Sequence, residues 1–571
     1  MSHQKLLQHI TDMALIILLL VGCRAPTPTP EPVTIRVAPD GTGDYPTLEE
    51  AVRRAPEGAT IFLVPGTYRL EEPLHIYKSL RLMGAGMDET EIVSNAPDYV
   101  ICFSGDGPFA AEDITFRHEG EAVADVVVVE GGDVAFARCR FTGAVYVEGE
   151  EDRAGLWLQG STTGIVQDCE AVENDNIGIL IEDRAQPTLE GNVCSDNAGS
   201  GIAYFGNAGG VALGNDCARN RKGFGILVGE LAQPALEGNV CTDNKGAGIA
   251  YGGNSGGVAR QNECLENWAG IAVGERAQPM LEENVCMDNG EIGIFYFGNA
   301  AGVARQNKCS GNGLYGISIE EQAQPTLEEN VCSDNEDTGI AYSDNASGVA
   351  RQNECSGNGI GIGVLDQAQP TLERNTSISN KKIGIFYLGS AAGVARQNEC
   401  SGNRMHGIAV SEQARPTLEE NVCTDNEQSG IAYGDSASGV ARQNECTGNL
   451  MGISVIDHAQ PTLEGNVCSD NENTGIAYSG NVGGVARWNE CSGNRAGIVV
   501  VEQAQPTLEA NICSDNEIAG ITYGGNAGGV ARQNECSGNG IGIVVLETAG
   551  PDLVDNDCHD NTEQDIVDLR P

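Results

Sequence analysis

The feature that most constrains this chain is an internal repeat. The tripeptide Ala-Gln-Pro, or a close variant of it, ends at nine positions that lie 45 to 47 residues apart: Pro187, Pro234, Pro279, Pro325, Pro370, Pro416, Pro461, Pro506 and Pro551. Each interval contains two Asn-x-Cys-x-x-Asn frames, so the underlying period is 22 to 23 residues and the visible module is a pair. A period of this length is typical of solenoids, in which each repeat packs only against its neighbours.

Each repeat consists of short β-prone runs separated by Gly, Asn and Pro corners. One repeat type reads Gly-Ile-Ala-Tyr, a Gly/Asn/Ser bend and Gly-Val-Ala-Arg-Gln-Asn-x-Cys. The other reads Gly-Ile-x-Val, an acid with Ala-Gln-Pro, and Thr-Leu-Glu-x-Asn-x-Cys. No stretch of useful length has helical periodicity. The pattern predicts an all-β parallel β-helix, whose coils stack about 4.8 Å apart.

The same residues carry a family resemblance. Asn-x-Cys-x-x-Asn followed by Gly-Ile resembles the repeat of right-handed β-helices of the pectin-lyase-like superfamily. That superfamily includes carbohydrate-binding and sugar-hydrolase domains, periplasmic NosD-type proteins and the β-helix of an F-box adaptor. The resemblance covers residues 33–571 and implies a single-stranded right-handed solenoid of roughly 20 coils, on the order of 100 Å long. These relatives do different things, so the resemblance specifies the fold and not the activity.

The start of the solenoid differs from the repeats. Val37–Gly86 resembles the opening of pectinesterase-like β-helices. Thr47 can cap a short helix over Leu48–Arg54, with Glu50 three residues later as in a capping box. The apolar positions of this segment fall on one helical face: Leu48, Ala51, Val52 and Ala55. We expect this helix to cover the open end of the first coil and to protect its strand edges.

The N-terminal residues predict export. We divide the chain into a signal peptide (1–22), a Pro/Thr-rich tether (23–32), a cap with irregular coils (33–160) and regular two-coil modules (161–571). The apolar run Met13–Val21 is too short to span a bilayer and ends in Leu-Val-Gly-Cys, which resembles a bacterial lipobox. The resemblance implies lipidation of Cys23 and a lipid-anchored, extracytoplasmic protein of the cell envelope. An ordinary cleaved signal is the alternative.

The charge balance restricts the partners. Acids outnumber bases 81 to 33, giving a formal net charge of −48. A surface of this sign argues against nucleic acid and against anionic membrane surfaces as partners. The membrane contact that we expect is therefore through the lipid alone, and we expect no cofactor.

A cysteine recurs once in nearly every repeat. We interpret this column as small side chains packed in a narrow interior, because Ser377 interrupts it and because stacked residues on parallel strands point the same way. Some disulfides are the alternative, and a metal site lacks the clustered spacing of zinc ligands. The flanking asparagines are expected to form stacked amide ladders. The column comprises Cys169, Cys194, Cys217, Cys241, Cys264, Cys286, Cys309, Cys332, Cys355, Ser377, Cys400, Cys423, Cys446, Cys468, Cys491, Cys513, Cys536 and Cys558.

Four residues before the cysteine, the two repeat types carry opposite charges. Stacking would alternate Glu and Arg along one edge, each neighbouring pair contributing roughly 0.2–1 kcal/mol. We read this as a structural device that disfavours a one-coil slip. The acids are Glu190, Glu237, Glu282, Glu328, Glu373, Glu419, Glu464 and Glu509, and the bases are Arg260, Arg305, Arg351, Arg396, Arg442, Arg487 and Arg532.

Two further columns have no obvious partners. The acidic one precedes Ala-Gln-Pro once per module, roughly 9.6 Å apart, which favours a solvated face over shared calcium sites: Asp183, Glu230, Glu275, Glu321, Asp366, Glu412, Asp457, Glu502 and Glu547. The aromatic one is either a partly buried corner stack or an external stripe on which sugars stack. It begins at Tyr204, and its candidate ligand-binding members are Tyr251, Tyr296, Tyr342, Tyr387, Tyr433, Tyr478 and Tyr523.

The signatures of the known β-helix enzymes are missing from the sequence. After "FARCRFTGA" the chain reads "VYVEGEEDRAG", without the Gln-Asp motif of pectinesterases, and the polygalacturonase and pectate lyase signatures are absent as well. His118, His406 and His458 share no common frame. One irregular acidic cluster is interpreted as a surface loop: Glu148, Glu150, Glu151, Asp152 and Arg153.

Three functions remain open from the sequence. The first, which the uninterrupted repeat favours, is a non-catalytic surface scaffold that binds polysaccharide or another envelope component. The second is a divergent polysaccharide lyase, hydrolase or epimerase housed in the irregular early coils. The third is a metal-handling protein of the NosD type.

Overall fold

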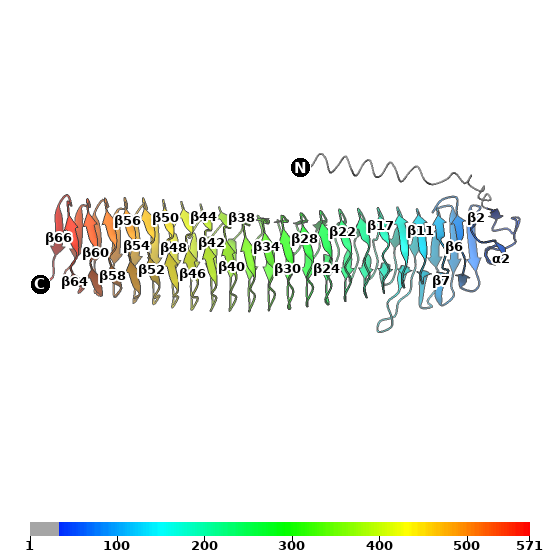
Figure 1. Cartoon of the computed structure of the whole chain (residues 1–571), viewed down its shortest axis with the longest axis horizontal. Coiled ribbons are helices and arrows are strands. Elements are labelled where there is room, and N and C mark those ends of the chain that lie inside the picture. The colour runs from blue at the N-terminus through cyan, green and yellow to red at the C-terminus, as the bar shows by residue number, and fades with distance from the viewer. Residues whose placement is uncertain (1–32) are drawn as a thin grey trace, which may run out of the picture.

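A computed structural model describes residues 33–571. The predictions for the signal peptide, for Cys23 and for the tether lie outside these residues. The described chain winds into one long straight rod of stacked coils, with its start and its C-terminus at opposite ends (Figure 1). One sheet of the rod has 23 strands, all in parallel register, so the rod is about 110 Å long. The predicted parallel β-helix of roughly 20 coils is confirmed.

Three sheets run the length of the rod. Sheet A begins with β1 (Thr34–Val37), β2 (Ala59–Leu63), β5 (Leu80–Met83), β8 (Phe109–Glu112), β11 (Asp133–Ala137), β14 (Thr163–Gln167) and β17 (Thr188–Glu190), and it ends with β64 (Asp552–Val554). Sheet B begins with β3 (Gly66–Leu70), β6 (Thr90–Ser94), β9 (Thr115–His118), β12 (Arg140–Thr142) and β15 (Glu170–Val172), continues from β20 (Asp216–Ala218) and ends with β65 (Asp557–His559). From β15 onward, the strands of sheets A and B are three residues long.

Sheet C has the longest strands of the regular coils. It comprises β4 (Leu74–Ile76), β7 (Asp98–Phe103), β10 (Ala124–Val129), β13 (Ala154–Leu158), β16 (Ile177–Ile181), β18 (Ile202–Tyr204), β21 (Ile226–Val228), β24 (Ala247–Tyr251), β27 (Ala269–Val273), β30 (Ile292–Tyr296), β33 (Tyr315–Ile319), β36 (Thr338–Tyr342), β39 (Ile360–Val364), β42 (Ile383–Tyr387), β45 (Ile408–Val410), β48 (Ser429–Tyr433), β51 (Met451–Val455), β54 (Thr474–Tyr478), β57 (Ala496–Val500), β60 (Ala519–Tyr523), β63 (Ile541–Val545) and β66 (Gln564–Asp568).

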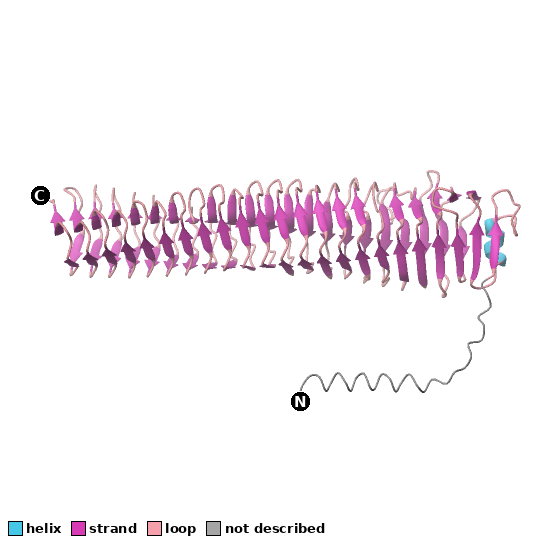
Figure 2. Cartoon of the chain, turned by 90° about the horizontal axis from the view of Figure 1, so that it is seen from above, coloured by secondary structure: helices cyan, strands magenta, loops and turns pink. Residues whose placement is uncertain are grey.

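One α-helix lies at the start of the rod. Helix α2 spans Leu48–Arg54, as predicted, and the Thr47 hydroxyl accepts a hydrogen bond from the Glu50 backbone N–H at 3.2 Å. Its apolar face is buried against the first coil, and Figure 2 shows it across the open end of the solenoid. No helix among residues 33–571 is long and apolar enough to cross a membrane.

The cysteines lie in register on sheet B. Cys446 and Cys468 are paired Cα partners, and the side chains from Cys194 to Cys536 are fully buried. The inward-packing interpretation is confirmed for these positions. Ser377 occupies the same column, where its hydroxyl donates to the Gly384 carbonyl at 2.7 Å. A hydroxyl with a local acceptor can therefore replace a thiol in this interior.

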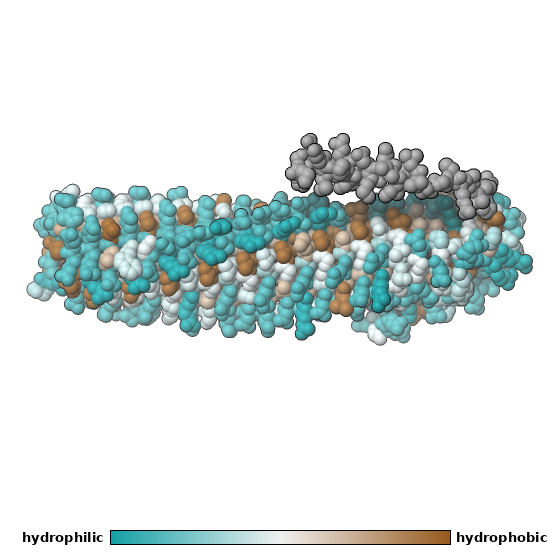
Figure 3. Space-filling view, viewed as in Figure 1, coloured by the Kyte–Doolittle hydropathy of each residue, from teal (hydrophilic) through white to brown (hydrophobic). Residues whose placement is uncertain are grey.

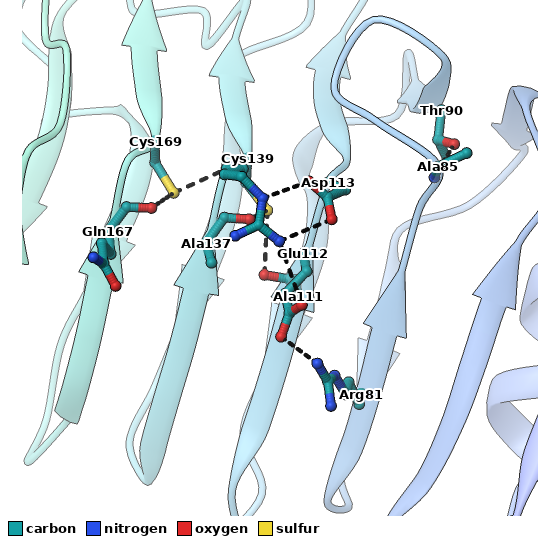
Figure 4. Close-up of polar contacts among 11 residues, drawn as sticks. Arg81, Ala85, Thr90, Ala111, Glu112, Asp113, Ala137, Cys139, Gln167 and Cys169 are labelled. Atoms are coloured by element: carbon teal, nitrogen blue, oxygen red, sulfur yellow. Dashed lines mark hydrogen bonds and ion pairs between the residues drawn. The ribbon is translucent and has the colours of Figure 1, made fainter.

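The assignment of Cys169 to this column is wrong. Bridges at Val193 connect β15 with β20, so Ala171 holds the column position and Cys169 lies two residues earlier, at the corner. There the Cys169 backbone N–H donates to the Asn192 side chain at 3.0 Å, and the Cys139 N–H donates to Cys169 Sγ at 3.3 Å (Figure 4). Cys139 and Cys169 thus begin a ladder that asparagines continue.

Two asparagine ladders confirm the predicted amide stacks. In each ladder the side-chain oxygen of one Asn accepts from both the backbone N–H and the side-chain NH₂ of the Asn one coil earlier, as between Asn330 and Asn353 at 3.0 and 2.9 Å. The NH₂ group of Asn353 also donates to the Leu327 carbonyl at 3.1 Å. Nearly every ladder side chain is buried, so two corners of each coil are held by buried amide groups that bond to one another and to the backbone.

The Glu/Arg alternation is present, but it forms separate pairs. Glu328 and Arg351 are Cα partners with a 3.1 Å salt bridge, and Arg351 is in turn the Cα partner of Glu373. Every arginine of the series bridges the glutamate one coil earlier: Arg260, Arg305, Arg351, Arg396, Arg442, Arg487 and Arg532. Each of these partly exposed pairs contributes little to stability. The Glu/Arg alternation therefore acts mainly by specifying which coils lie next to each other.

Candidate functional site

The outer face of sheet C between β13 and β63 differs from the other two sheets because its strands carry no charged side chain. Side chains alternate between the two faces of a strand, so Ile249 and Tyr251 point inward and Ala250 points outward. No strand of sheet C from β13 to β63 contains Asp, Glu, Lys or Arg. In contrast, every strand of sheet A from β22 (Ala235–Glu237) to β61 (Val530–Arg532) ends in Glu or Arg. In Figure 3 most of the surface in view is hydrophilic, with apolar residues recurring from coil to coil.

Aromatic side chains gather on this uncharged face between β13 and β33. We call them the aromatic strip, which consists of Trp157, Phe205, Phe224, Trp268, Phe295, Phe297 and Tyr315. Except for Trp268, they are partly buried against two small apolar clusters outside the main core. Trp268 stands edge-on to Phe295, with ring centroids 6.1 Å apart, and Phe295 stacks on Phe297 at 4.9 Å.

Small residues form the floor of the strip. The floor consists of Ala247, Ala250, Ala269 and Ala272, and several rings of the strip pack against these residues. Trp268 lies at the corner just before β27 and is 38 % exposed. Rings that are half-buried on a flat uncharged sheet keep one face or edge available to a ligand.

A polar groove of about 780 Å³ adjoins the strip at the corner between sheets B and C. Its lining includes Trp268, Arg221 and Lys245 together with acids of successive coils. Arg219 forms two hydrogen bonds with Asp196, at 3.1 and 2.8 Å, and this pairing lowers the pKa of the Asp196 carboxyl. The groove therefore offers fixed donors and acceptors next to an aromatic ring. Stacking surfaces combined with a few placed polar groups are typical of small-molecule and sugar sites.

The predicted tyrosine column lies in the interior. Tyr296, Tyr342, Tyr387, Tyr433, Tyr478 and Tyr523 are fully buried, and Tyr251 is 3 % exposed. Burial raises the pKa of each hydroxyl, and no hydroxyl of the column has a hydrogen-bond partner within residues 33–571. These rings cannot form an external sugar-stacking stripe. The buried stack is therefore confirmed, and the external stripe is wrong because successive side chains of a strand point to opposite faces, so that the neighbouring Ala or Phe points outward instead.

Sequence reasoning missed the aromatic strip, although a signal for it existed. In most repeats the outward positions of sheet C hold Ala, Gly, Ser or Thr. Phe and Trp replace them mainly in the modules between Trp157 and Tyr315. A ligand-binding residue in a solenoid is expected to depart from the repeat, as these do.

The acidic column lies on exposed turns and partly serves the backbone. Glu275 accepts a hydrogen bond from the Gly253 N–H at 2.7 Å, and Glu230 accepts one from the Gly206 N–H at 2.8 Å. In two places the column has an acid in every coil, whereas the sequence predicted one acid per two-coil module. Asp344 and Asp435 enter it from the other coil type, giving the consecutive runs Glu321–Asp344–Asp366 and Glu412–Asp435–Asp457.

The irregular acidic cluster before β13 lies in a surface loop, as we inferred from the sequence. The side chains of Glu148, Glu150, Glu151 and Asp152 are exposed. Arg153 is the exception because it forms a 3.0 Å salt bridge with Asp125, which is 1 % exposed. Burial raises the pKa of Asp125 to about 6.

Comparison with known proteins identifies the family. The model described as "Right handed beta helix region" matches residues 124–286, 267–377 and 360–511, and that of "Periplasmic copper-binding protein (NosD)" matches residues 459–569. No curated protein matches the chain. Among solved structures, the A-module of the Azotobacter vinelandii mannuronan C-5 epimerase AlgE4 is 19 % identical over 48 % of this chain and 86 % of its own, with a TM-score of 0.39.

The periplasmic alginate epimerase AlgG is 16 % identical over 60 % of this chain and 82 % of its own, with a TM-score of 0.40. Pectate lyase Pel9A is 15 % identical over 57 % and 79 %, with a TM-score of 0.31. Likenesses this distant carry no information on activity. The family match covers more than half of the sequence, and the parallel coils agree with it. The chain therefore belongs to the right-handed parallel β-helix family.

Proposed function

We propose that this protein is a non-catalytic scaffold that binds an extended polysaccharide, or a similar envelope polymer, along the outer face of sheet C. The single observation that carries the proposal is the aromatic strip on an otherwise small-residue, uncharged face. Sugar rings present apolar C–H faces that stack on aromatic rings, while their hydroxyls need donors and acceptors at the side. The groove beside Trp268 supplies such groups.

The charge of the protein favours a neutral polymer as the ligand. The formal net charge is −48, and a polyuronate would be repelled over the full length of the rod. The uncharged strands of sheet C are where this repulsion is weakest at close range. A neutral glycan could follow the face over many coils, because it brings no charged group next to the acidic side chains of the protein.

The location belongs to the same proposal. Lipidation of Cys23 and the tether at 23–32 would hold the rod at the outer side of a membrane with its repeats extended away from it. The NosD family, whose model matches the C-terminal coils, is described as periplasmic, which supports an extracytoplasmic site. Replacing Cys23 by Ala should release the protein from the membrane fraction. Retention of this variant would contradict the lipid anchor without affecting the glycan proposal.

The test is a glycan array followed by titration of the best neutral polymer. Trp268→Ala and Phe295→Ala should each weaken binding about fivefold, from a stacking contribution of ~1 kcal/mol per ring. Trp488→Ala is the matched control, because Trp488 is 56 % exposed at a corner off the strip, where Arg487 covers its ring. Equal losses in the control and in the strip variants would contradict the assignment of the site.

Catalysis is tested on the same polymers. Reducing-sugar and unsaturated-product assays should show no turnover by the wild-type protein. Turnover would replace the scaffold proposal by a divergent lyase, hydrolase or epimerase. In that event the irregular early coils are the first region to search, since catalytic groups are expected to interrupt a repeat.

A further inference from the structure

An irregular side-chain cluster lies on the outer face of sheet C in the first coils. His75 on β4 and Cys102 on β7 are paired Cα partners, and Glu130 directly follows β10. One ligand atom of each residue lies within 4.8 Å of the others. Within residues 33–571 this is the one group of three such residues brought so close together. Three successive coils therefore each contribute one nitrogen, sulfur or oxygen donor.

The histidine ring is held in a fixed orientation. Its Nδ1 lies 3.2 Å from the Tyr99 hydroxyl, and its Nε2 lies 2.8 Å from the Ser104 hydroxyl. The Tyr77 ring stacks on it, with centroids 4.1 Å apart and an interplanar angle of 11°. Metal-binding histidines characteristically have the second ring nitrogen fixed by such an outer hydrogen bond. One ring nitrogen of His75 can ligate while a hydroxyl holds the other.

Cys102 differs from the other buried cysteines of the chain. The column cysteines face the interior of the coil, whereas Cys102 is paired with His75 on the outer face and is 1 % exposed. Burial, with a contribution from Glu130, raises the pKa of the thiol to about 12. In the metal-free protein this group is a neutral thiol, and a bound cation would displace its proton.

We propose that His75, Cys102 and Glu130 bind a divalent transition metal ion of the zinc type. Imidazole nitrogen, thiolate sulfur and carboxylate oxygen are the donors that Zn²⁺ takes in proteins. Three protein ligands leave a fourth position for water or for another donor. The ion would join three coils at the start of the rod, next to the uncharged face. Spacing along the chain does not indicate this set of ligands, because its members lie 27 and 28 residues apart rather than in a clustered motif.

The test uses Co²⁺ as a spectroscopic probe in the full-length protein after treatment with a chelator. We expect one Co²⁺ per chain, a thiolate charge-transfer absorption in the near ultraviolet, and loss of that absorption when Zn²⁺ is added. Binding should strengthen as the pH rises, because Cys102 must lose its proton. Cys102→Ser should abolish the absorption.

Two variants keep the result interpretable. Cys355→Ser is the matched control, since it removes an interior thiol next to a position that already holds serine, and it should retain the absorption. Glu130 is exposed, so Glu130→Gln should fold normally, keep the thiol and weaken Co²⁺ binding at least tenfold. No charge-transfer band in the wild type, a band that survives Cys102→Ser, or unchanged affinity in Glu130→Gln would each overturn the proposal. None of these outcomes bears on glycan binding.

Discussion

Removing one asparagine from the middle of a ladder should destabilise the rod locally and strongly. Asn353 is 1 % exposed, and its side chain takes part in four hydrogen bonds: two accepted from Asn330, one donated to Asn375 and one donated to the Leu327 carbonyl. Alanine at this position would leave the Asn330 backbone N–H without its acceptor and would take one donor from Leu327.

The magnitude follows from those four hydrogen bonds. Each contributes about 0.5–1.5 kcal/mol net, so Asn353→Ala should cost about 2–6 kcal/mol. The last member of the same ladder provides the comparison. Asn556 is only partly buried and has no asparagine beyond it, so water can replace its lost bonds and Asn556→Ala should cost about 1 kcal/mol.

The assay must measure the stability of the affected coil rather than that of the whole rod. Coils contact only their neighbours, so the unfolding of such a rod need not be two-state, and a single free energy of unfolding is not well defined. Hydrogen exchange of amides 326–333 measures the opening of the affected coil directly. Asn353→Ala should accelerate exchange there by several hundredfold, and Asn556→Ala should leave it unchanged. Similar exchange in the two variants, or a local cost below about 1 kcal/mol for Asn353→Ala, would refute the ladder as a main source of stability.

Three further predictions concern single side chains. Burial lowers the pKa of His406 to about 4, below the 6.5 of its unfolded form, so the unfolded state binds more protons between these values and stability should fall as the pH falls through this window. The difference in stability between wild type and His406→Gln should change by about 2–3 kcal/mol from pH 7 to pH 4, and a constant difference would contradict the burial effect. Tyr342→Phe removes a buried hydroxyl that has no hydrogen-bond partner within residues 33–571, so thermal unfolding should show a midpoint that is unchanged or raised; a large decrease would reveal a polar role for the hydroxyl. Ala510 has a φ of 50° at a corner where Gly465 serves in another repeat, and Ala510→Gly should stabilise the protein by about 1 kcal/mol, whereas loss of stability in a denaturant titration would show that the corner is not strained.

The fold was predictable from the repeat, whereas the candidate site was predictable only in part because side chains alternate between the two faces of a strand. The period, the asparagine ladders, the inward cysteines and the capping helix each follow from local pattern, because a coil must repeat its corners wherever it stacks on an identical coil. The tyrosine column and Cys169 show the limit of that reasoning. A shift of one residue in a strand exchanges the two faces, and a shift of two moves a side chain from a strand to a corner.

The amino-acid sequence by itself determined that the chain is a parallel solenoid, how most of its coils align, and which residue types stack in columns. Only the tertiary structure decided which columns face solvent, that the Glu/Arg alternation resolves into pairs, and that His75, Cys102 and Glu130 converge. The physical reason is that stacking depends on spacing along the chain, which the repeat displays. Exposure depends on which face of a strand a residue occupies, which the spacing alone leaves open. The convergence of His75, Cys102 and Glu130 depends on how the irregular first coils place their turns, and those coils have no period from which to infer it.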